Sequence, residues 1–330
     1  MMLKALPLLL AFVPCLSSGQ TPTPKPPPPV AHADPANVDD DDFKIQGEYV
    51  GEREGRRFGV QIIALGEGKF EAVRYLGGLP GDGWNVNREE VIRTNGERSF
   101  GSQKAIFQRD DMKGEADGTS IIVTNASNER VVEMNRVKRL SPTLDLQPPA
   151  GAIVLFDGKE NHFPGSKVTA DGLLEQGATS SDKFGDCTLH LEFMLSYMPK
   201  ARGQGRSNSG VYLQGRYEVQ VLDSFGLEGK NNECGGLYTI QSPKLNMCFP
   251  PLTWQTYDID FTAAKYDAEG KKISSARFTV KHNGVIVHDN VEAPHTTTAA
   301  PVKEENSPGP LYLQNHGNPV RYRNVWMVTK

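Results

Sequence analysis

Short runs in which apolar and polar side chains alternate with a period of two follow one another along most of the chain. The clearest is "CTLHLEFML" (187–195), where Leu189, Leu191 and Phe193 alternate with His190 and Glu192. A period of two places one set of side chains on each face of a β-strand. Glycine and proline, 33 and 23 of 330 residues, mark turns between the runs. Because no long stretch has the helical period, the sequence predicts an all-β protein.

Two hairpins are predicted in the C-terminal half. "SGVYLQGRYEVQVLD" (209–223) contains two strands that meet at Gly215-Arg216, and "ARFTVKHNGVIVHD" (276–289) places Asn283-Gly284 between two alternating runs. Asn-Gly is the strongest short-range signal for a tight hairpin turn. With many antiparallel strands in about 180 residues, a two-sheet sandwich of jelly-roll type is expected.

Changes in composition divide the chain into five segments. The first has a lysine and a short apolar run, "LPLLLAFV" (6–13), typical of a signal peptide that is cleaved near Gln20, whereas anchoring as a lipoprotein through Cys15 is disfavoured by Pro14. A tether rich in proline and aspartate follows, and its acidic run is expected to bury nothing. The segments are a signal peptide (1–19), a linker (20–42), a small antiparallel β domain (43–140), a second linker (141–152) and the sandwich (153–330).

The remaining composition restricts function and location. The formal net charge is −4, and the sequence has no stripe of basic residues. Both observations argue against a nucleic-acid partner. No later segment is long and apolar enough to span a membrane, so we expect an exported protein, periplasmic or extracellular.

The mature chain would keep Cys187, Cys234 and Cys248, which allow either three thiols or one bridge, with Cys234–Cys248 the favoured pair. "GGLPGDGW" (77–84) lacks the Lys-Ser/Thr of a phosphate-binding loop and is interpreted as a structural turn.

The strands of the sandwich share an unusual polar face. Opposite their apolar positions they carry Tyr, Gln, Glu and His instead of the Lys and Thr of an ordinary solvated face. The set is His190, Glu192, Tyr212, Gln214, Glu218, Gln220, Tyr312, Gln314 and His316. For any one residue, exposure to solvent or cross-strand pairing is the simpler explanation. Taken together, the set predicts a shared recess in which a hydroxyl-rich ligand replaces water.

Seven blocks in this half resemble the 3-keto-disaccharide hydrolase domain family, which is common in exported bacterial proteins and has a concanavalin-A-like sandwich. They are "LFDGKE" (155–160), "FGDCTLHLEF" (184–193), "SNSGVYLQGRYEVQVLDS" (207–224), "GGLYTIQSP" (235–243), "TWQTYDIDF" (253–261), "HNGVIVHD" (282–289) and "GPLYLQNHGNPVRYRNVWM" (309–327). Two departures, "SYMPKARGQGRS" (196–207) and "TTTAAPVKEENS" (296–307), are expected to reshape the rim of the site. The first domain resembles segments that precede this family in some bacteria, and the resemblance gives it no activity.

The resemblance implies cleavage of glycosides that carry a ketone at C3. The ketone acidifies the proton at C2, so that a base can form an enolate, which expels the group on C1 before water adds. Such a site needs a base, an electrophile near the C3 oxygen and a proton donor for the leaving group. His316 is the first candidate for the base, because an imidazole titrates near neutral pH. Glu218 is the competing base or the proton donor, and Arg323 is expected to hold the oxyanion or, alternatively, to pair with Glu218.

Other residues are expected to position the sugar hydroxyls: Glu192, Asn208, Gln220, Asp223, Tyr238 and Gln314. The sequence requires no cofactor, although a divalent metal held by Asp223, Glu218 or His316 remains open. The alternative to an enzyme is a non-catalytic carbohydrate-binding module or a cell-surface interaction module, since this fold also serves lectins. For the enzyme and the carbohydrate-binding module the expected partner is a small carbohydrate, whereas in a cell-surface interaction module the sugar groove would be vestigial.

Overall fold

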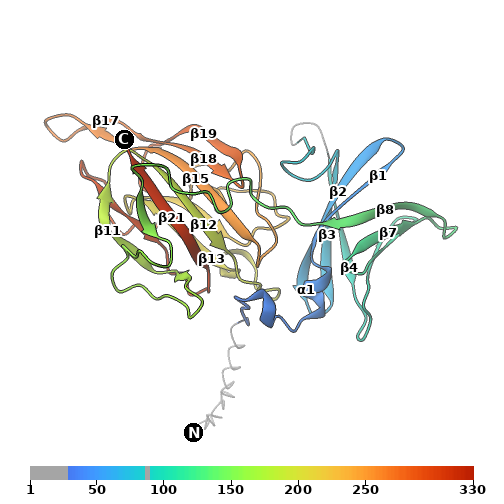
Figure 1. Cartoon of the computed structure of the whole chain (residues 1–330). Helices are drawn as coiled ribbons and strands as arrows, with labels where there is room; N and C mark the ends of the chain where they lie inside the picture. The colour runs from blue at the N-terminus through green and yellow to red at the C-terminus, as the bar shows by residue number, and fades with distance from the viewer. Residues whose placement is uncertain (1–28, 86–89) are drawn as a thin grey trace, which may run out of the picture.

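The computed structural model describes residues 29–85 and 90–330, which form two β units (Figure 1). The predicted signal peptide and most of the proline-rich run lie outside the described residues. Within these residues, no helix is long and apolar enough to cross a membrane. The expected fold class, an all-β chain with a small antiparallel domain before a jelly-roll sandwich, is confirmed.

The first unit is a closed antiparallel barrel in which each strand pairs with the next and β1 also pairs with β8. The strands are β1 (Gly47–Arg53), β2 (Arg56–Gly66), β3 (Lys69–Leu76), β4 (Val91–Glu97), β5 (Ala105–Arg109), β6 (Met112–Ala116), β7 (Ser120–Thr124) and β8 (Arg130–Val137). The Gly77–Trp84 segment is a structural turn between β3 and β4, and the ion pair of Arg57 with Asp82 (2.6 Å) holds it.

The acidic run before the barrel is not a free tether, which corrects the sequence-based expectation. A short helix, α1 (Asp41–Ile45), begins there, and the Asp40 side chain caps it by accepting from the Asp42 amide. Asp42 is itself buried, where it accepts from the Gly68 amide and from Arg98. Carboxylates persist in this position because the first turn of a helix offers unpaired N–H groups.

The second unit is a sandwich of two antiparallel sheets. The larger sheet has the order β10-β21-β12-β15-β18-β19, with β9 on the far part of β21, and the smaller sheet has the order β11-β20-β13-β14. The strands of the larger sheet are β9 (Ile153–Phe156), β10 (Leu174–Glu175), β12 (Cys187–Met194), β15 (Trp254–Thr262), β18 (Ala276–His282), β19 (Val285–Ala293) and β21 (Arg321–Thr329). The strands of the smaller sheet are β11 (Ala178–Phe184), β13 (Asn208–Leu213), β14 (Tyr217–Leu222) and β20 (Gly309–Leu313). A ribbon, β16 (Lys265–Tyr266) with β17 (Lys272–Ser274), and two 3-10 turns, Pro35–Asn37 and Gly203–Gly205, complete the described elements.

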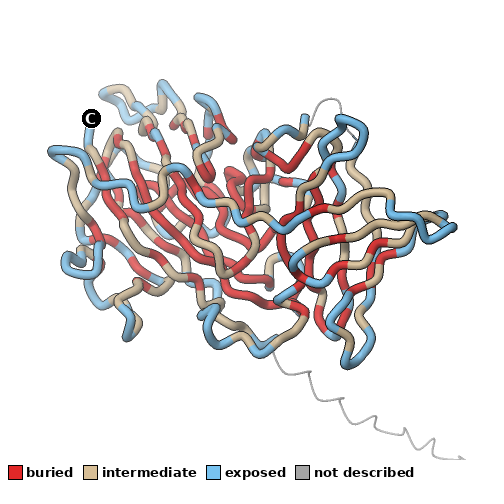
Figure 2. The backbone as a smooth tube through the Cα atoms, turned by 45° about the vertical axis from the view of Figure 1, so that its right-hand side comes forward, coloured by how far each residue is buried: buried red, intermediate tan, exposed pale blue. Residues whose placement is uncertain are grey.

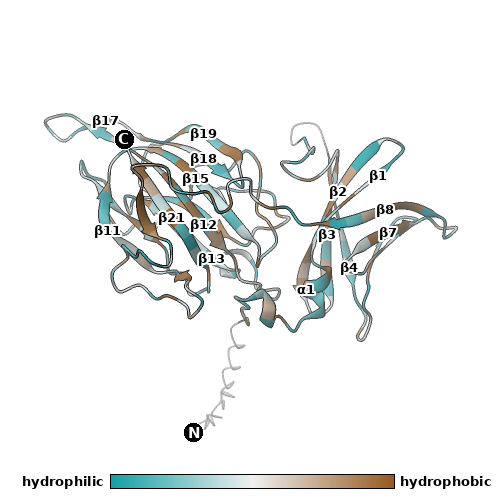
Figure 3. Ribbon diagram, viewed as in Figure 1, coloured by the Kyte–Doolittle hydropathy of each residue, from teal (hydrophilic) through white to brown (hydrophobic). Residues whose placement is uncertain are grey.

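Both predicted hairpins are confirmed. β13 pairs with β14 around Gly215, and β18 pairs with β19 around Asn283-Gly284. Asn283 and Gly284 have φ of 49° and 79°, which a two-residue turn of this type requires at both positions. The alternating hydropathy along the strands appears as brown and teal bands in Figure 3.

The two units pack against each other through a shared apolar core. Ile63, Val73 and Tyr75 point outward from β2 and β3, away from the barrel interior, and belong to the same buried cluster as the sandwich core. At Gly226 of the sandwich, a Cβ atom would lie 2.5 Å from Ile63 Cδ1 and would displace the Ile63 side chain, and the φ of +73° also favours glycine there. Figure 2 shows buried backbone in the sandwich and in the barrel strands that face it.

The three cysteines of the described residues are thiols. Cys187, Cys234 and Cys248 are free and buried. Of the two possibilities that the sequence left open, the structure has three thiols and no bridge between Cys234 and Cys248. The hydroxyl of Tyr257 lies 3.2 Å from the Cys234 sulfur, inside the sandwich core.

Candidate active site

The candidate site lies on the outer face of the smaller sheet. In β13 and β14, Val211, Leu213, Tyr217 and Val219 point into the core, so Tyr212 and Glu218, which alternate with them, point outward. Tyr212 lies opposite Glu218 across the two strands, which places their side chains together. We call the outward-facing set the Glu218 cluster: Asn208, Tyr212, Glu218, Gln220 and Gln314.

Gly210 makes room for the carboxyl group of Glu218. It lies on β13 diagonally across from Glu218, and the Glu218 side chain leans over it. A Cβ atom on Gly210 would lie 2.1 Å from Glu218 Oε1 and 2.8 Å from Cδ, far inside contact distance. The missing side chain therefore determines where the carboxyl group can lie.

Tyr212 joins Glu218 to its surroundings. Its hydroxyl lies 2.8 Å from Glu218 Oε2 and 3.1 Å from the Thr298 carbonyl oxygen, and Gln314 Nε2 donates to it at 3.1 Å. A tyrosine has one proton and cannot donate fully to both acceptors. If Glu218 is protonated, it donates to Tyr212, and Tyr212 can then donate to Thr298. The hydrogen bonds are thus best satisfied by a neutral Glu218.

The electrostatics agree with a neutral Glu218. Burial raises the pKa of Glu218 to about 8, while the hydrogen bond from Tyr212 acts to lower it. Glu218 is 2% exposed, and no cation contributes to its pKa shift. A buried carboxyl group with a pKa near the working pH is typical of groups that transfer protons in active sites.

The other half of the cluster offers hydrogen-bond acceptors. Gln204, on the Gly203–Gly205 turn, bridges two members: its Oε1 accepts from Asn208 Nδ2 and from Gln220 Nε2, each at 3.0 Å. Asn208 Oδ1 and Gln314 Oε1 are buried and have no hydrogen-bond partner among the described residues. An unsatisfied buried polar atom costs about 1–3 kcal/mol. These two oxygens are therefore candidates to accept hydrogen bonds from a ligand.

Tyrosines border the cluster. The Tyr238 amide donates to the Glu218 carbonyl, so the segment that carries Tyr238 extends the sheet beside β14. The Tyr312 ring lies 5.5 Å from that of Tyr212, measured between centroids. The Tyr312 hydroxyl accepts from the Asn315 amide at 3.3 Å and keeps its own proton for another acceptor.

His316 does not belong to the strand that the sequence predicts for it. β20 ends at Leu313, and His316 is exposed in the loop that follows. This loop is nevertheless fixed to β13 on both sides of His316: the Gln314 amide donates to the Gly210 carbonyl, and Asn318 Oδ1 accepts from the Asn208 amide. The predicted alternation does not reach His316, because the strand register with β13 and β11 ends at Leu313 and only the Gln314 amide continues the backbone pairing.

Asp223 is engaged in a buried ion pair. Its Oδ2 lies 2.7 Å from Arg206 Nε, and both residues are almost fully buried. Its other oxygen, Oδ1, accepts from the Phe225 amide. No group of three or more candidate metal-ligand residues lies together in the described part of the chain, and a divalent metal held by Asp223, Glu218 or His316 stays a prediction.

Glu192 and Arg323 lie on the opposite side of the sandwich from Glu218. Leu191 and Phe193 point into the core from β12, so Glu192 points out of the larger sheet. Its partner there is Arg323 on β21, with Arg323 Nε 2.7 Å from Glu192 Oε2. The prediction that Glu192 and Arg323 share a recess with Glu218 is therefore wrong, because sequence alternation cannot tell which of two sheets a strand joins. The alternative that Arg323 pairs with Glu218 is wrong for the same reason.

This second polar face is covered by the linker between the two units. The Asp145 amide donates to Glu192 Oε1 at 2.6 Å, and Asp145 Oδ1 lies 2.9 Å from Arg323 Nη2. Burial acts to raise the pKa of Glu192, but His190, Asn324 and Arg323 outweigh it and hold the pKa at about 2. Glu192 is thus an ionised group that fastens the linker to the sandwich.

Both departures from the family pattern lie beside the site or between the units. Segment 196–207 carries Gln204 into the cluster and connects to the barrel, where Arg202 donates to the Leu65 carbonyl. Segment 296–307 folds over the β13–β14 turn: Thr297 Oγ1 accepts from the Glu218 amide, and Thr298 lies against Tyr212.

Sequence reasoning did not propose Tyr212, Gly210 or Gln204 as site residues. Only Tyr212 gave a signal, through its place in the alternation.

The comparisons with known proteins place the chain in a family. A model of the 3-keto-disaccharide hydrolase family, described as a 3-keto-alpha-glucoside-1,2-lyase-like domain, matches residues 151–328. The protein is thus a carbohydrate-active protein of glycosidase-like type. The chain belongs to this family, as the seven sequence blocks predicted. No curated protein matches the chain.

Three solved structures from Parabacteroides distasonis ATCC 8503 are similar to it, each described provisionally as a glycosyl hydrolase. One has 30% sequence identity and a TM-score of 0.49, covering 55% of this chain and 85% of the other. The second has 19% identity and a TM-score of 0.39, covering 55% and 94%. The third has 17% identity and a TM-score of 0.37, covering 54% and 99%.

Proposed function

We propose that the protein is an exported enzyme that cleaves 3-keto-glycosides and that the Glu218 cluster is its active site. Family membership supports the substrate class, which is the one named in the family's description. The observation that carries the site is the buried, neutral carboxyl group of Glu218 over Gly210, beside two amide oxygens without partners. A buried acid surrounded by free acceptors fits an uncharged, hydroxyl-rich ligand.

The proposed reaction is an elimination followed by hydration. A base removes the proton at C2, and the electron pair forms the C3 enolate. The enolate then re-forms the ketone, makes a C1=C2 double bond and breaks the bond from C1 to the glycosidic oxygen, which takes a proton. Water adds to C1 and a proton to C2, which gives the free 3-keto sugar. The initial step yields a stabilised carbanion and not the oxocarbenium ion of conventional glycosidases, so a pair of carboxylates at fixed separation is not needed.

The cluster supplies groups for these steps. Glu218, neutral at pH 7, is the proposed proton donor to the leaving oxygen, and its carboxylate can then take the proton of the incoming water. His316 stays our candidate for the base at C2, on the loop that Gln314 and Asn318 anchor to β13. With Arg323 on the far side of the sandwich, the Tyr312 hydroxyl is the proposed donor to the C3 oxygen. Asn208 and Gln314 would accept from sugar hydroxyls, with Gln220 and Tyr238 beside them.

The test is turnover of 3-keto-trehalose and 3-keto-lactose by the full chain, with and without a chelator, followed as free sugar. In D2O, elimination and hydration place one deuterium at C2 of the released sugar, whereas direct hydrolysis places none. A control with preformed 3-keto sugar corrects for exchange without enzyme. The chelator arm decides whether a divalent metal takes part.

Variants separate an enzyme from a binding module. We expect Glu218→Gln and His316→Gln to abolish turnover while keeping ligand affinity within about tenfold, since each removes a proton-transfer group but keeps its size and polarity. Glu228→Gln, an exposed site, and His162→Gln, whose ring contacts Asp182, are the matched controls and should stay active. Saturable binding of keto-sugars with no turnover of any of them would instead establish a binding module.

Export rests on the sequence of residues 1–19 alone. We propose cleavage near Gln20, with delivery to the periplasm or beyond. Sequencing the N-terminus of protein made with its leader tests this, and a mature chain that begins at Met1 would contradict it.

A further inference from the structure

The barrel is closed at one end and open at the other. Helix α1 lies across one end: the Tyr49 hydroxyl donates to the Ile45 carbonyl at 2.5 Å, and Arg136 donates to the Lys44 and Gln46 carbonyls. Ile45 is 1% exposed and belongs to the apolar cluster inside the barrel. The barrel therefore has the form of a cup whose floor is α1 and the buried side chains above it.

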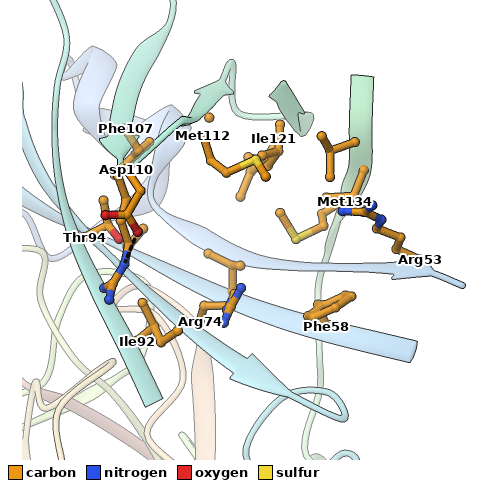
Figure 4. A pocket seen from close by; sticks show the side chains of 17 residues that line it. Arg53, Phe58, Arg74, Ile92, Thr94, Phe107, Asp110, Met112, Ile121 and Met134 are labelled. Atoms are coloured by element: carbon orange, nitrogen blue, oxygen red, sulfur yellow. Dashed lines mark ion pairs between the residues drawn. The ribbon is translucent and has the colours of Figure 1, made fainter. Parts of the chain in front are cut away.

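A cavity of about 410 Å³ occupies the other end. All eight strands contribute to its lining, and most of the lining side chains are apolar, among them Phe58, Ile92, Met112, Ile121 and Met134 (Figure 4). Several of them, including Phe58 and Ile92, are only half-buried, so they line the cavity without filling it. Cavities of 300–1,000 Å³ with apolar walls and few polar groups are typical of small-molecule sites, and an eight-stranded barrel is wide enough for one small ligand.

The charged groups of the lining are mostly cationic. Arg53, Arg74 and Arg109 line the cavity with a single carboxylate, Asp110. Arg109 pairs with Asp110 at 3.7 Å, the contact that is dashed in Figure 4, and Arg53 pairs with Glu54. Arg74 has no ion-pair partner in the described part of the chain, and its guanidinium lies 5.8 Å from the centre of the Phe58 ring. An apolar cup with an unpaired guanidinium is suited to a ligand with an apolar body and one anionic group.

We propose that this cavity is a second binding site, for a small amphipathic anion such as a medium-chain carboxylate. The apolar body lies among the inward-facing side chains, and the anionic group meets Arg74. The site is in the barrel and does not use the Glu218 cluster, so it is independent of the proposed enzymatic activity.

Gly114 offers a way to fill the cavity without disturbing the barrel. Its φ is not in the left-handed region, and a Cβ atom there would meet Phe107 Cβ at 3.6 Å and Ile121 Cγ2 at 3.9 Å, both ordinary contacts. Gly114→Leu should therefore occupy the ligand space and leave the fold intact. Val123→Trp, on β7, fills the same space from a different strand.

The test measures binding of three probes with the same chain to the full-length protein by calorimetry, below their micellar concentrations: dodecanoate, dodecanol and dodecyltrimethylammonium. We expect dodecanoate to bind with one-to-one stoichiometry and about tenfold more tightly than the cation, because a charge-assisted hydrogen bond to arginine favours the anion. Arg74→Met should reduce dodecanoate affinity about tenfold and leave dodecanol unchanged. Arg56→Met, at the same end of the barrel but outside the lining, is the control and should bind as the wild type does.

Each other outcome overturns the proposal. Absence of saturable binding refutes the site. Binding that persists in both Gly114→Leu and Val123→Trp, with their circular dichroism unchanged, places the ligand elsewhere. Equal affinity for all three probes, or an Arg74→Met variant that binds dodecanoate as well as the wild type, refutes the anionic specificity.

Discussion

Replacing Glu218 with glutamine should make the stability of the protein less sensitive to pH. The glutamine keeps the size of the side chain, and its amide group can still donate to Tyr212, but it cannot ionise. In the wild type, burial raises the pKa of Glu218 from 4.5 to about 8. A carboxyl group whose pKa is higher in the folded state stabilises the fold only while it is protonated.

The sign and size of the effect follow from the two pKa values. Below pH 4.5, Glu218 is protonated in both the folded and the unfolded chain, and its full contribution is present. Between pH 4.5 and 8 the unfolded chain releases the proton and the folded chain keeps it, so stability falls by about 1.4 kcal/mol for each pH unit. The loss reaches about 3 kcal/mol at pH 7 and about 5 kcal/mol above pH 8. The Glu218→Gln variant has no such loss.

The assay is urea denaturation of the wild type and of Glu218→Gln at pH 5, 6, 7 and 8, followed by tryptophan fluorescence, with two of the three tryptophans, Trp254 and Trp326, in the sandwich. The buried His282 and His288, whose pKa values burial lowers to about 3 and about 4, titrate in both proteins and cancel in the difference. The free energy of unfolding of the variant should rise relative to the wild type by several kcal/mol from pH 5 to 8. Parallel pH profiles would refute the neutral carboxyl group and, with it, its role as proton donor.

Three further predictions concern other residues. Gly210→Ala should lower turnover about 100-fold by displacing the Glu218 carboxyl group. The control is Gly185→Ala, where a Cβ atom meets nothing within 4 Å, and it should keep its turnover. Equal activity of both variants would show that the position of the carboxyl group is unimportant. Arg206→Met should destabilise the protein to urea by about 3–5 kcal/mol, because it leaves the buried Asp223 without its ion-pair partner. Adding Asp223→Asn should recover part of the loss, and no recovery would contradict this cause. Arg323→Gln should weaken the attachment of the linker and lower the unfolding free energy by about 1–3 kcal/mol. Its turnover should stay within about twofold of the wild type. A large loss of turnover in folded protein would show that Arg323 belongs to the active site.

The fold was predictable from local patterns, because each rests on contacts between neighbours in sequence. The alternation in 187–195 determined which side chains of β12 point into the sandwich core, and Asn283-Gly284 determined the β18–β19 turn. The β13–β14 pairing, and with it the contact of Tyr212 with Glu218, follows from the hairpin. The part of the site that lies on one hairpin was therefore within reach of the sequence.

The remaining site depends on contacts between distant segments. Gln314 reaches the cluster because β20 pairs with β13, and Gln204 reaches it from a segment that departs from the family pattern. Gly210 is one of 33 glycines, and only the position of the Glu218 side chain shows that its missing Cβ matters. His316 and Glu192 were misplaced because alternation gives the face of a strand, but neither the end of a strand nor the sheet that it joins.

The two outer faces of the sandwich show why one carboxylate is structural and the other is available for chemistry. Both Glu192 and Glu218 are buried and point away from the core. Glu192 accepts hydrogen bonds from Arg323, Asn324 and the Asp145 amide, and His190, Asn324 and Arg323 hold its pKa at about 2 against the effect of burial. Glu218 meets no cation, and its pKa rises to about 8.

A carboxylate that is already ionised and saturated with hydrogen bonds has little left to exchange with a substrate. A neutral one that donates to Tyr212, which in turn donates to the Thr298 carbonyl oxygen, can give up its proton when a ligand rearranges those bonds. The difference does not come from residue type or from the local sequence pattern. It comes from the neighbours: β21 places Arg323 and Asn324 beside Glu192 and the linker adds the Asp145 amide, whereas no cation lies beside Glu218.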